Sequence, residues 1–197
     1  MNIALLTAAG IGSRMHQDIP KQFLHIRNKP VILYTLEAFQ QSALIDEIIV
    51  VSLANWQDML WAYANQYNIT KLKYIVVGGE SGQESIFCGL KELAKEHSDQ
   101  DVVMVHDGNR PMISQEIIAD SFAVFKKYGS AVAAIPCIEA IFQSEDGRSS
   151  DVAIPREKLW RTQTPHTYML GELLEAHQAA HKYLQYNSVM CINANVR

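Results

Sequence analysis

The chain of 197 residues is long enough for one domain with a buried core, and its 48% hydrophobic and 19% charged residues exclude a disordered protein. The net charge of −4, with no long cluster of Lys or Arg, argues against a nucleic acid or a membrane surface as a partner. Cys88, Cys137 and Cys191 form no Cys-x-x-Cys pair, and the N-terminal apolar run is too short for a signal sequence or a membrane span. We therefore expect a cytoplasmic protein with reduced thiols.

Short apolar runs alternate with segments of helical periodicity from residue 2 to about residue 136. The apolar runs predict buried strands at residues 2–7, 47–53, 73–77, 101–105 and 130–136. The periodic segments predict helices at residues 30–45, 56–67, 114–129 and 169–185, and one that begins at Ser81 or Gly82. This alternation is typical of βαβ units, so we expect a Rossmann-like α/β fold: a mostly parallel sheet with helices on both faces.

Residues 137–158 break this rhythm, because two short β-like pieces flank a polar Ser-Glu-Asp-Gly turn. They predict a β-hairpin arm that projects from a single domain of residues 1–197 and packs on a second subunit. Residues 155–166 contain two prolines and by themselves predict a rigid loop. The last residues lack the closing strand and helix that this architecture requires, so we expect the C-terminus to be incomplete.

The loop after the first predicted strand is built from small residues. It is not a dinucleotide fingerprint, because Met15 stands in place of the third glycine, and the Gly-Lys-Ser/Thr of a Walker A loop does not occur. Its backbone N–H groups could still approach a phosphate closely, and Arg14 and Lys21 follow as cations. The alternative is a tight turn with two solvated cations. The small residues are Ala8, Ala9, Gly10 and Gly12.

A second candidate site follows the strand predicted at residues 101–105. Asp107 lies at the edge of the sheet where open α/β proteins bind ligands. Mg²⁺ prefers one or two carboxylates together with substrate and water, so Asp107 is a candidate ligand, and Arg110 adds a cation beside it. The alternative is that Asp107 caps a turn and pairs with Arg110.

A third candidate site follows the strand predicted at residues 73–77. Two glycines end that strand, and Ser85 lies in the first turn of the next helix. Backbone N–H groups and a hydroxyl at this place could read the polar edge of a base. The alternative is a helix capped by Ser81.

Several of these stretches share their order and spacing with one enzyme family. They are Ala8-Ala9-Gly10-Ile11-Gly12-Ser13-Arg14-Met15 with Pro20-Lys21-Gln22, His106-Asp107-Gly108-Asn109-Arg110-Pro111, and the Thr-Gln-Thr-Pro-His of residues 162–166 after Arg156. From residue 1 to about residue 175 the chain resembles the cytidylyltransferases that act on 2-C-methyl-D-erythritol 4-phosphate or on ribitol 5-phosphate. The resemblance implies transfer of CMP from CTP to a polyol phosphate, with release of pyrophosphate and Mg²⁺ as the cofactor. It also implies a homodimer, in which the arm carries Arg156 to the partner's site.

The same resemblance implies roles for individual residues. Arg14 and Lys21 would be catalytic, because they would neutralise the triphosphate. Asp107 would hold Mg²⁺. The residues implied in nucleotide binding are Ala8, Ala9, Gly10, Gly12, Gly79, Ser85 and Asp107. Those implied in acceptor binding are Arg110, Glu139, Arg156 and Thr164.

Three features depart from the family pattern. Gly82 stands in place of an arginine, Glu139-Ala140 stand in place of an Asp-Thr pair in the arm, and the lysine of a C-terminal Asn-Ile-Lys or Asn-Leu-Lys stretch is not seen before Arg197. The second and third leave the acceptor open.

The lead acceptor is 2-C-methyl-D-erythritol 4-phosphate, for isoprenoid precursor synthesis. The alternative acceptor is ribitol 5-phosphate, for wall or capsule polymers. Residues 144–157 and 162–166 favour this alternative. A hexose-1-phosphate nucleotidylyltransferase would lack the His-Asp-x-x-Arg-Pro stretch. The alternative from outside the enzymes is a protein that binds a nucleotide without catalysis.

Overall fold

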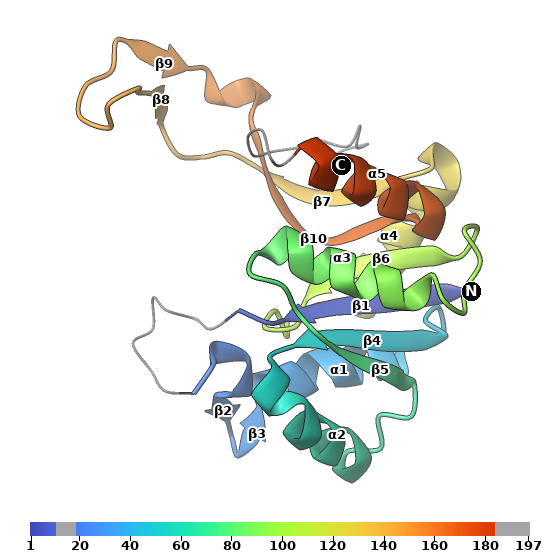
Figure 1. Cartoon of the computed structure of the whole chain (residues 1–197). Coiled ribbons are helices and arrows are strands. Elements are labelled where there is room, and N and C mark those ends of the chain that lie inside the picture. Colours follow the sequence, from blue (N-terminus) through green and yellow to red (C-terminus); the bar gives the residue numbers. More distant parts are fainter. Residues whose placement is uncertain (11–18, 184–197) are drawn as a thin grey trace.

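The computed structural model describes residues 1–10 and 19–183, and within them the chain forms a six-stranded sheet in the order β5-β4-β1-β6-β10-β7 (Figure 1). Strand β1 pairs in parallel with β4 and β6, and β4 pairs in parallel with β5. The mostly parallel α/β sheet predicted from the alternating pattern is therefore confirmed. The strands are β1 (Asn2–Ala8), β4 (Glu47–Ser52), β5 (Leu72–Val77), β6 (Val102–Asp107), β7 (Ala131–Pro136) and β10 (Trp160–Met169).

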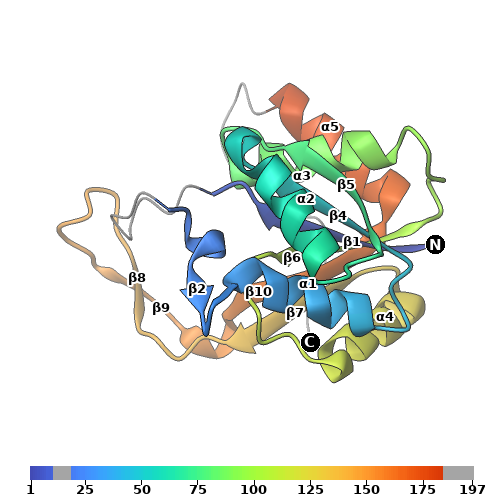
Figure 2. The ribbon, with the colours of Figure 1, turned by 90° about the horizontal axis from the view of Figure 1, so that it is seen from below.

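In the described part of the chain five helices cover the two faces of the sheet: α3 and α5 pack on one face, and α1, α2 and α4 on the other. Figure 2 shows α3 and α5 on one side of the sheet and α1 and α4 on the other. Gly129 ends α4 with a φ of 81°, a left-handed conformation that costs glycine little. None of the helices in the described part of the chain is long and apolar enough to cross a membrane. The helices are α1 (Val31–Gln41), α2 (Gln57–Gln66), α3 (Gly82–Leu93), α4 (Gln115–Tyr128) and α5 (Leu170–Tyr183).

The core divides at β1, which is buried on both faces. Ala4 and Leu6 pack with α1, α2 and α4, whereas Ile3 and Leu5 pack with α3 and α5. All four side chains are fully buried. A strand buried on both faces has no polar face, and this explains why residues 2–7 read as a continuous apolar run.

The strand β10 corrects the expectation of a rigid loop at residues 155–166. From Trp160 onward the chain lies between β6 and β7 and runs antiparallel to both. The segment is polar and contains Pro165, and proline argues against a central strand because it cannot donate to the ladder. The sheet accommodates it with a register shift between Thr162 and His166, and β10 pairs with β7 on both sides of that shift.

The predicted hairpin arm is confirmed: β8 (Ile141–Gln143) and β9 (Val152–Ile154) form an antiparallel pair. Both views show the arm projecting from the body at the end of the sheet where β1 and β6 finish (Figures 1 and 2). Its apolar side chains are poorly covered, because Ile138 is 73% and Phe142 is 64% exposed. That it serves for dimerisation stays a prediction.

Candidate active site

The carboxyl ends of β1, β5 and β6 surround a cleft of about 360 Å³. Parallel strands present their carboxyl ends at one edge of the sheet, so three loops that are far apart in sequence meet there. The structure thus brings together most of the predicted site. The predicted residues that line the cleft are Ala8, Ala9, Gly10, Lys21, Gly79, Ser85, Asp107 and Arg110.

Asp107, the last residue of β6, lies opposite Thr7 of β1 in the parallel register. Thr7 Oγ1 donates to Asp107 Oδ1 at 3.2 Å, and Arg110 Nε donates to Asp107 Oδ2 at 2.6 Å. Arg110 Nη1 also donates to Gln163 Oε1 at 2.6 Å, and the Asp107 backbone N–H donates to Thr164 Oγ1 at 3.3 Å. The Asp107–Arg110 ion pair, given above as the alternative to a metal site, is present. It holds the Asp107 carboxylate in one orientation beside the cleft.

The loop after β5 leads into a capped helix. Ser81 Oγ accepts from the Glu84 backbone N–H at 3.1 Å, and the Glu84 carboxylate accepts from the Ser81 N–H, so the predicted cap is a complete capping box. A Cβ on Gly78 would lie 2.3 Å from Ala9 Cβ and 2.7 Å from Ser85 Oγ. Only glycine therefore lets the loops after β1 and β5 approach each other, with the N-terminus of α3 at the cleft.

Lys21 opens the short 3₁₀ turn η2 (Lys21–Phe23) and lines the cleft. Within residues 1–10 and 19–183 no carboxylate pairs with Lys21, whereas Arg110 is paired with Asp107. Among the cleft residues that the structure describes, Lys21 is therefore the cation that is available to an anionic ligand.

Two histidines, the buried His106 and the half-buried His166, support the loops around Asp107. His106 Nε2 donates to the Arg110 carbonyl at 3.1 Å, and His166 Nε2 donates to the Gln163 carbonyl at 2.5 Å. Burial lowers the pKa of both imidazoles below the ordinary 6.5, so both are neutral at pH 7. His106 Nδ1 is buried and has no partner among the described residues. Both rings orient backbone turns.

The lowered pKa of His106 predicts that acid destabilises the fold. Below pH 6.5 the unfolded chain takes up a proton that the folded protein resists, so the free energy of unfolding falls as the pH falls. One such group contributes at most about 1.4 kcal/mol per pH unit. Urea unfolding at pH 7.5 and 5.5 measures this slope, which we expect to be smaller in His106→Gln. His25→Gln, at an exposed histidine, is the control, and an equal slope in all three proteins would contradict the assignment.

Three of the predicted residues that the structure describes do not line the cleft with the rest of the site. Thr164 touches it indirectly, through Asp107. Glu139 and Arg156 belong to the arm region, where Glu139 pairs with Arg161 at 3.0 Å and Arg156 donates to the Ile138 carbonyl at 2.8 Å. Gly12 and Arg14, the remaining predictions, lie outside the described residues.

Sequence reasoning missed several residues that line the cleft or orient it. Thr7 could be found only from the pairing of β1 with β6, since in the sequence it only ends an apolar run. Gln22 and Gln163 stand inside matched stretches, but nothing in the sequence says which groups they contact. The other lining residues that were missed are Glu80, Ser81 and Asn109.

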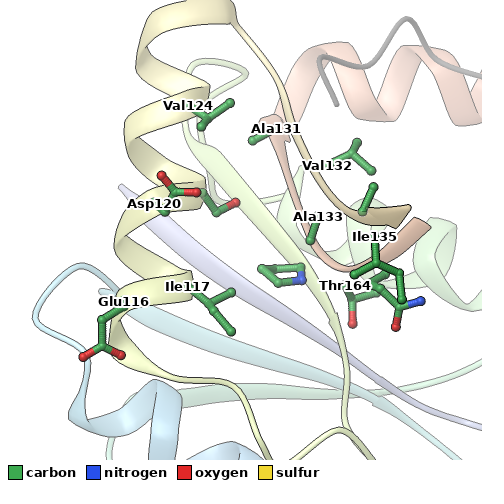
Figure 3. A pocket seen from close by; sticks show the side chains of 13 residues that line it. Glu116, Ile117, Asp120, Val124, Ala131, Val132, Ala133, Ile135 and Thr164 are labelled. Carbon is green, nitrogen blue, oxygen red and sulfur yellow. The ribbon is translucent and has the colours of Figure 1, made fainter. Parts of the chain in front are cut away.

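A second cavity, of about 490 Å³, lies between α4, β7 and β10 (Figure 3). Figure 3 shows Glu116, Ile117 and Asp120 on α4 at one side of the cavity and the apolar side chains of Val132 and Ile135 at the other. Among the described residues that line this cavity there is no Lys, Arg or His. A triphosphate needs cations and N–H donors, so this cavity does not suit it, and the cleft at the ends of β1, β5 and β6 is the candidate active site.

The site brings together a small-residue loop, a lysine and an oriented carboxylate at the carboxyl edge of a mostly parallel sheet. This is the arrangement of a nucleotidyltransferase. Comparison with known proteins gives the family. The profile described as IspD, 2-C-methyl-D-erythritol 4-phosphate cytidylyltransferase, matches residues 2–188. The chain belongs to this family of cytidylyltransferases.

Curated relatives carry two names. A ribitol-5-phosphate cytidylyltransferase of Vibrio parahaemolyticus is 40% identical over 182 residues, which are 91% of this chain and 76% of the relative. A 2-C-methyl-D-erythritol 4-phosphate cytidylyltransferase of Clostridium acetobutylicum is 38% identical over 188 residues, covering 92% and 78%. Among solved structures, the 2-C-methyl-D-erythritol 4-phosphate cytidylyltransferase of Francisella tularensis superposes with a TM-score of 0.80 at 26% identity, covering 99% of this chain and 88% of that one.

Proposed function

We propose that this chain transfers CMP from CTP to a small polyol phosphate, forming a CDP-polyol and releasing pyrophosphate. The observation that carries the proposal is that one cleft contains residues 8–10 of the small-residue loop, Lys21, the capped N-terminus of α3 and Asp107. Backbone N–H groups and a helix N-terminus bind anions, and Lys21 supplies a positive charge. Because CTP is a cytoplasmic nucleotide, we also propose a cytoplasmic location.

In the proposed reaction an oxygen of the acceptor phosphate attacks the α-phosphorus of CTP, and the bond from that phosphorus to the pyrophosphate oxygen breaks. The acceptor phosphate is largely ionised at pH 7, so no general base is needed. This agrees with His106 and His166, whose Nε2 atoms are used in hydrogen bonds to backbone carbonyls. The residues would act by positioning the reactants and by neutralising charge. Lys21 and Arg14 would neutralise the phosphates, and the role of Arg14 stays a prediction from the sequence.

Mg²⁺ is the proposed cofactor, and Asp107 is its proposed ligand. Within the described residues no three His, Cys, Asp or Glu side chains are grouped to hold a metal by themselves. A single oriented carboxylate suits an ion that takes most of its ligands from phosphates and water. When bound, Mg²⁺ would withdraw charge from the phosphate oxygens; Arg110 and Thr7 would keep the Asp107 carboxylate aimed at it.

For the acceptor we propose Arg110 and Thr164 beside Asp107, with Glu139 and Arg156 brought by the arm of a second copy. The exposed Ile138 and Phe142 favour an arm that is covered in a homodimer. Molar mass in solution tests this assembly, and a monomer at micromolar concentration would contradict it.

Pyrophosphate release from CTP, measured with a panel of polyol phosphates, tests the proposed activity. Turnover with 2-C-methyl-D-erythritol 4-phosphate is the lead expectation. Turnover with ribitol 5-phosphate is the alternative, favoured by residues 144–157 and 162–166 and by relatives that carry that name. Binding of CTP without turnover on any acceptor would contradict the enzyme and favour a binding protein.

Gly82 offers a test of the nucleotide side of the cleft. It is the first residue of α3 and lines the cleft, and a Cβ added there would meet nothing within 4 Å. We expect Gly82→Arg to lower the KM for CTP severalfold, because about 1 kcal/mol from one added cation is a factor of about five. Gly82→Met is the uncharged control. A KM that moves equally in both variants would show that charge is not the cause.

A further inference from the structure

We propose that Gln22 is a positioning residue for Lys21: it fastens the turn that carries the lysine to the end of β1. The inference rests on the proposed function, because it assumes that Lys21 acts on the phosphates. It concerns how the lysine is held, which neither the sequence pattern nor the comparisons address.

The first observation is a buried hydrogen bond. Gln22 Nε2 donates to the Ala8 carbonyl at 2.6 Å, and the Gln22 side chain is 1% exposed. Ala8 is the last residue of β1, so its carbonyl lies where the strand ladder stops and needs another donor. The same side chain therefore completes the end of β1 and ties the following turn to it.

The second observation is an aromatic stack on the next residue. The Phe23 ring lies on the Trp56 ring with centroids 4.3 Å apart and planes 17° apart. Phe23 is buried, and half-buried Trp56 ends the 3₁₀ turn η3 (Ala54–Trp56), which follows β4. Such a pair adds directional packing to the burial of the two rings. The turn is thus joined to β1 through Gln22 and to the loop after β4 through Phe23.

Lys21 stands directly before these two anchors. The turn itself is closed by the Phe23 N–H, which donates to the Pro20 carbonyl at 2.9 Å. The flexible side chain of a lysine does not define its own position, so the backbone beneath it must. With Gln22 and Phe23 fixed, the Lys21 backbone cannot move away from the nucleotide cleft without breaking a buried contact.

The test replaces Gln22 with methionine, which has a similar length and no donor. We expect kcat to fall about tenfold to a hundredfold, the scale of a misplaced catalytic group, while the KM for CTP changes less than about threefold. The control is Gln115→Met, because Gln115 Nε2 also donates to a backbone carbonyl, that of Ala38 at 2.8 Å, in an exposed bond away from the cleft. We expect the control to keep its kcat.

A double-mutant cycle separates positioning from general loosening of the fold. If Gln22 acts through Lys21, adding Gln22→Met to Lys21→Ala lowers kcat by less than about twofold more. A full further loss would overturn the inference, as would an unchanged kcat in folded Gln22→Met. If Gln22→Met does not fold, Trp56→Leu removes the stack instead, and an unchanged kcat in that variant overturns the inference.

The cycle also tells this failure from a failure of the proposed function. If Lys21→Ala alone keeps its kcat, the role proposed for Lys21 is wrong. If Lys21→Ala loses activity and Gln22→Met does not, only the role of Gln22 is wrong.

Discussion

Replacing Lys21 with alanine is expected to lower kcat by about a hundredfold to a thousandfold and to raise the KM for CTP by less than about fivefold. The reason is that charge on the phosphate oxygens grows and shifts as pyrophosphate leaves, so a positioned cation binds the transition state more strongly than it binds CTP. In the described part of the cleft, Arg110 cannot substitute for the lysine, because its Nε is 2.6 Å from Asp107 Oδ2.

Steady-state kinetics with CTP varied at saturating acceptor measure the two effects separately. Lys73→Ala is the control, since Lys73 is an exposed lysine on β5 that does not line the cleft. If the KM for CTP rises with kcat unchanged, Lys21 contributes only uniform binding, and the catalytic role is contradicted.

Replacing Asp107 with asparagine is expected to lower kcat/KM by at least about a hundredfold. The amide keeps the shape and the Thr7 contact but removes the negative charge, so the proposed Mg²⁺ ligand is lost and the Arg110 guanidinium loses its partner. Because metal affinity falls, we also expect the concentration of Mg²⁺ needed for half-maximal activity to rise.

Titration of activity against Mg²⁺ checks this second effect. Asp120→Asn is the control, because Asp120 lies on the exposed surface of α4, outside the candidate active site. An Asp107→Asn protein that keeps the wild-type Mg²⁺ dependence and has lost activity would show that the carboxylate acts through Arg110 alone. A protein that keeps full activity would contradict both roles.

Much of the fold was predictable because local patterns agree with it. The apolar run at residues 2–7 is buried on both faces, and Ile32, Leu36 and Phe39 recur at helical spacing and are fully buried in α1. Periodicity reports which side chains face a core, and a core-facing residue must be apolar whatever its partner. The predicted strands and helices are accordingly confirmed, apart from shifts at their ends.

The strand β10 was missed because its stability does not come from its own sequence. Trp160–Met169 is polar and contains Pro165, and it becomes a strand because β6 and β7 offer it ladder partners on both sides. Neighbours that are distant in sequence can override a weak local preference. The same strand brings Gln163 and Thr164 beside Arg110 and Asp107, so an error about the fold was also an error about the site.

By itself the sequence determined the α/β class, the small-residue loop, the arm, the family, and the residue types that a phosphate site needs, since each depends on side chains close together in the chain. Only the tertiary structure decided which of them meet. It placed Thr7 opposite Asp107, paired Arg110 with that carboxylate, and left Lys21 as the described cation available to a ligand, on a turn fastened by Gln22. Strand order and register set these contacts, and both follow from the packing of the whole sheet, which no short stretch of sequence contains.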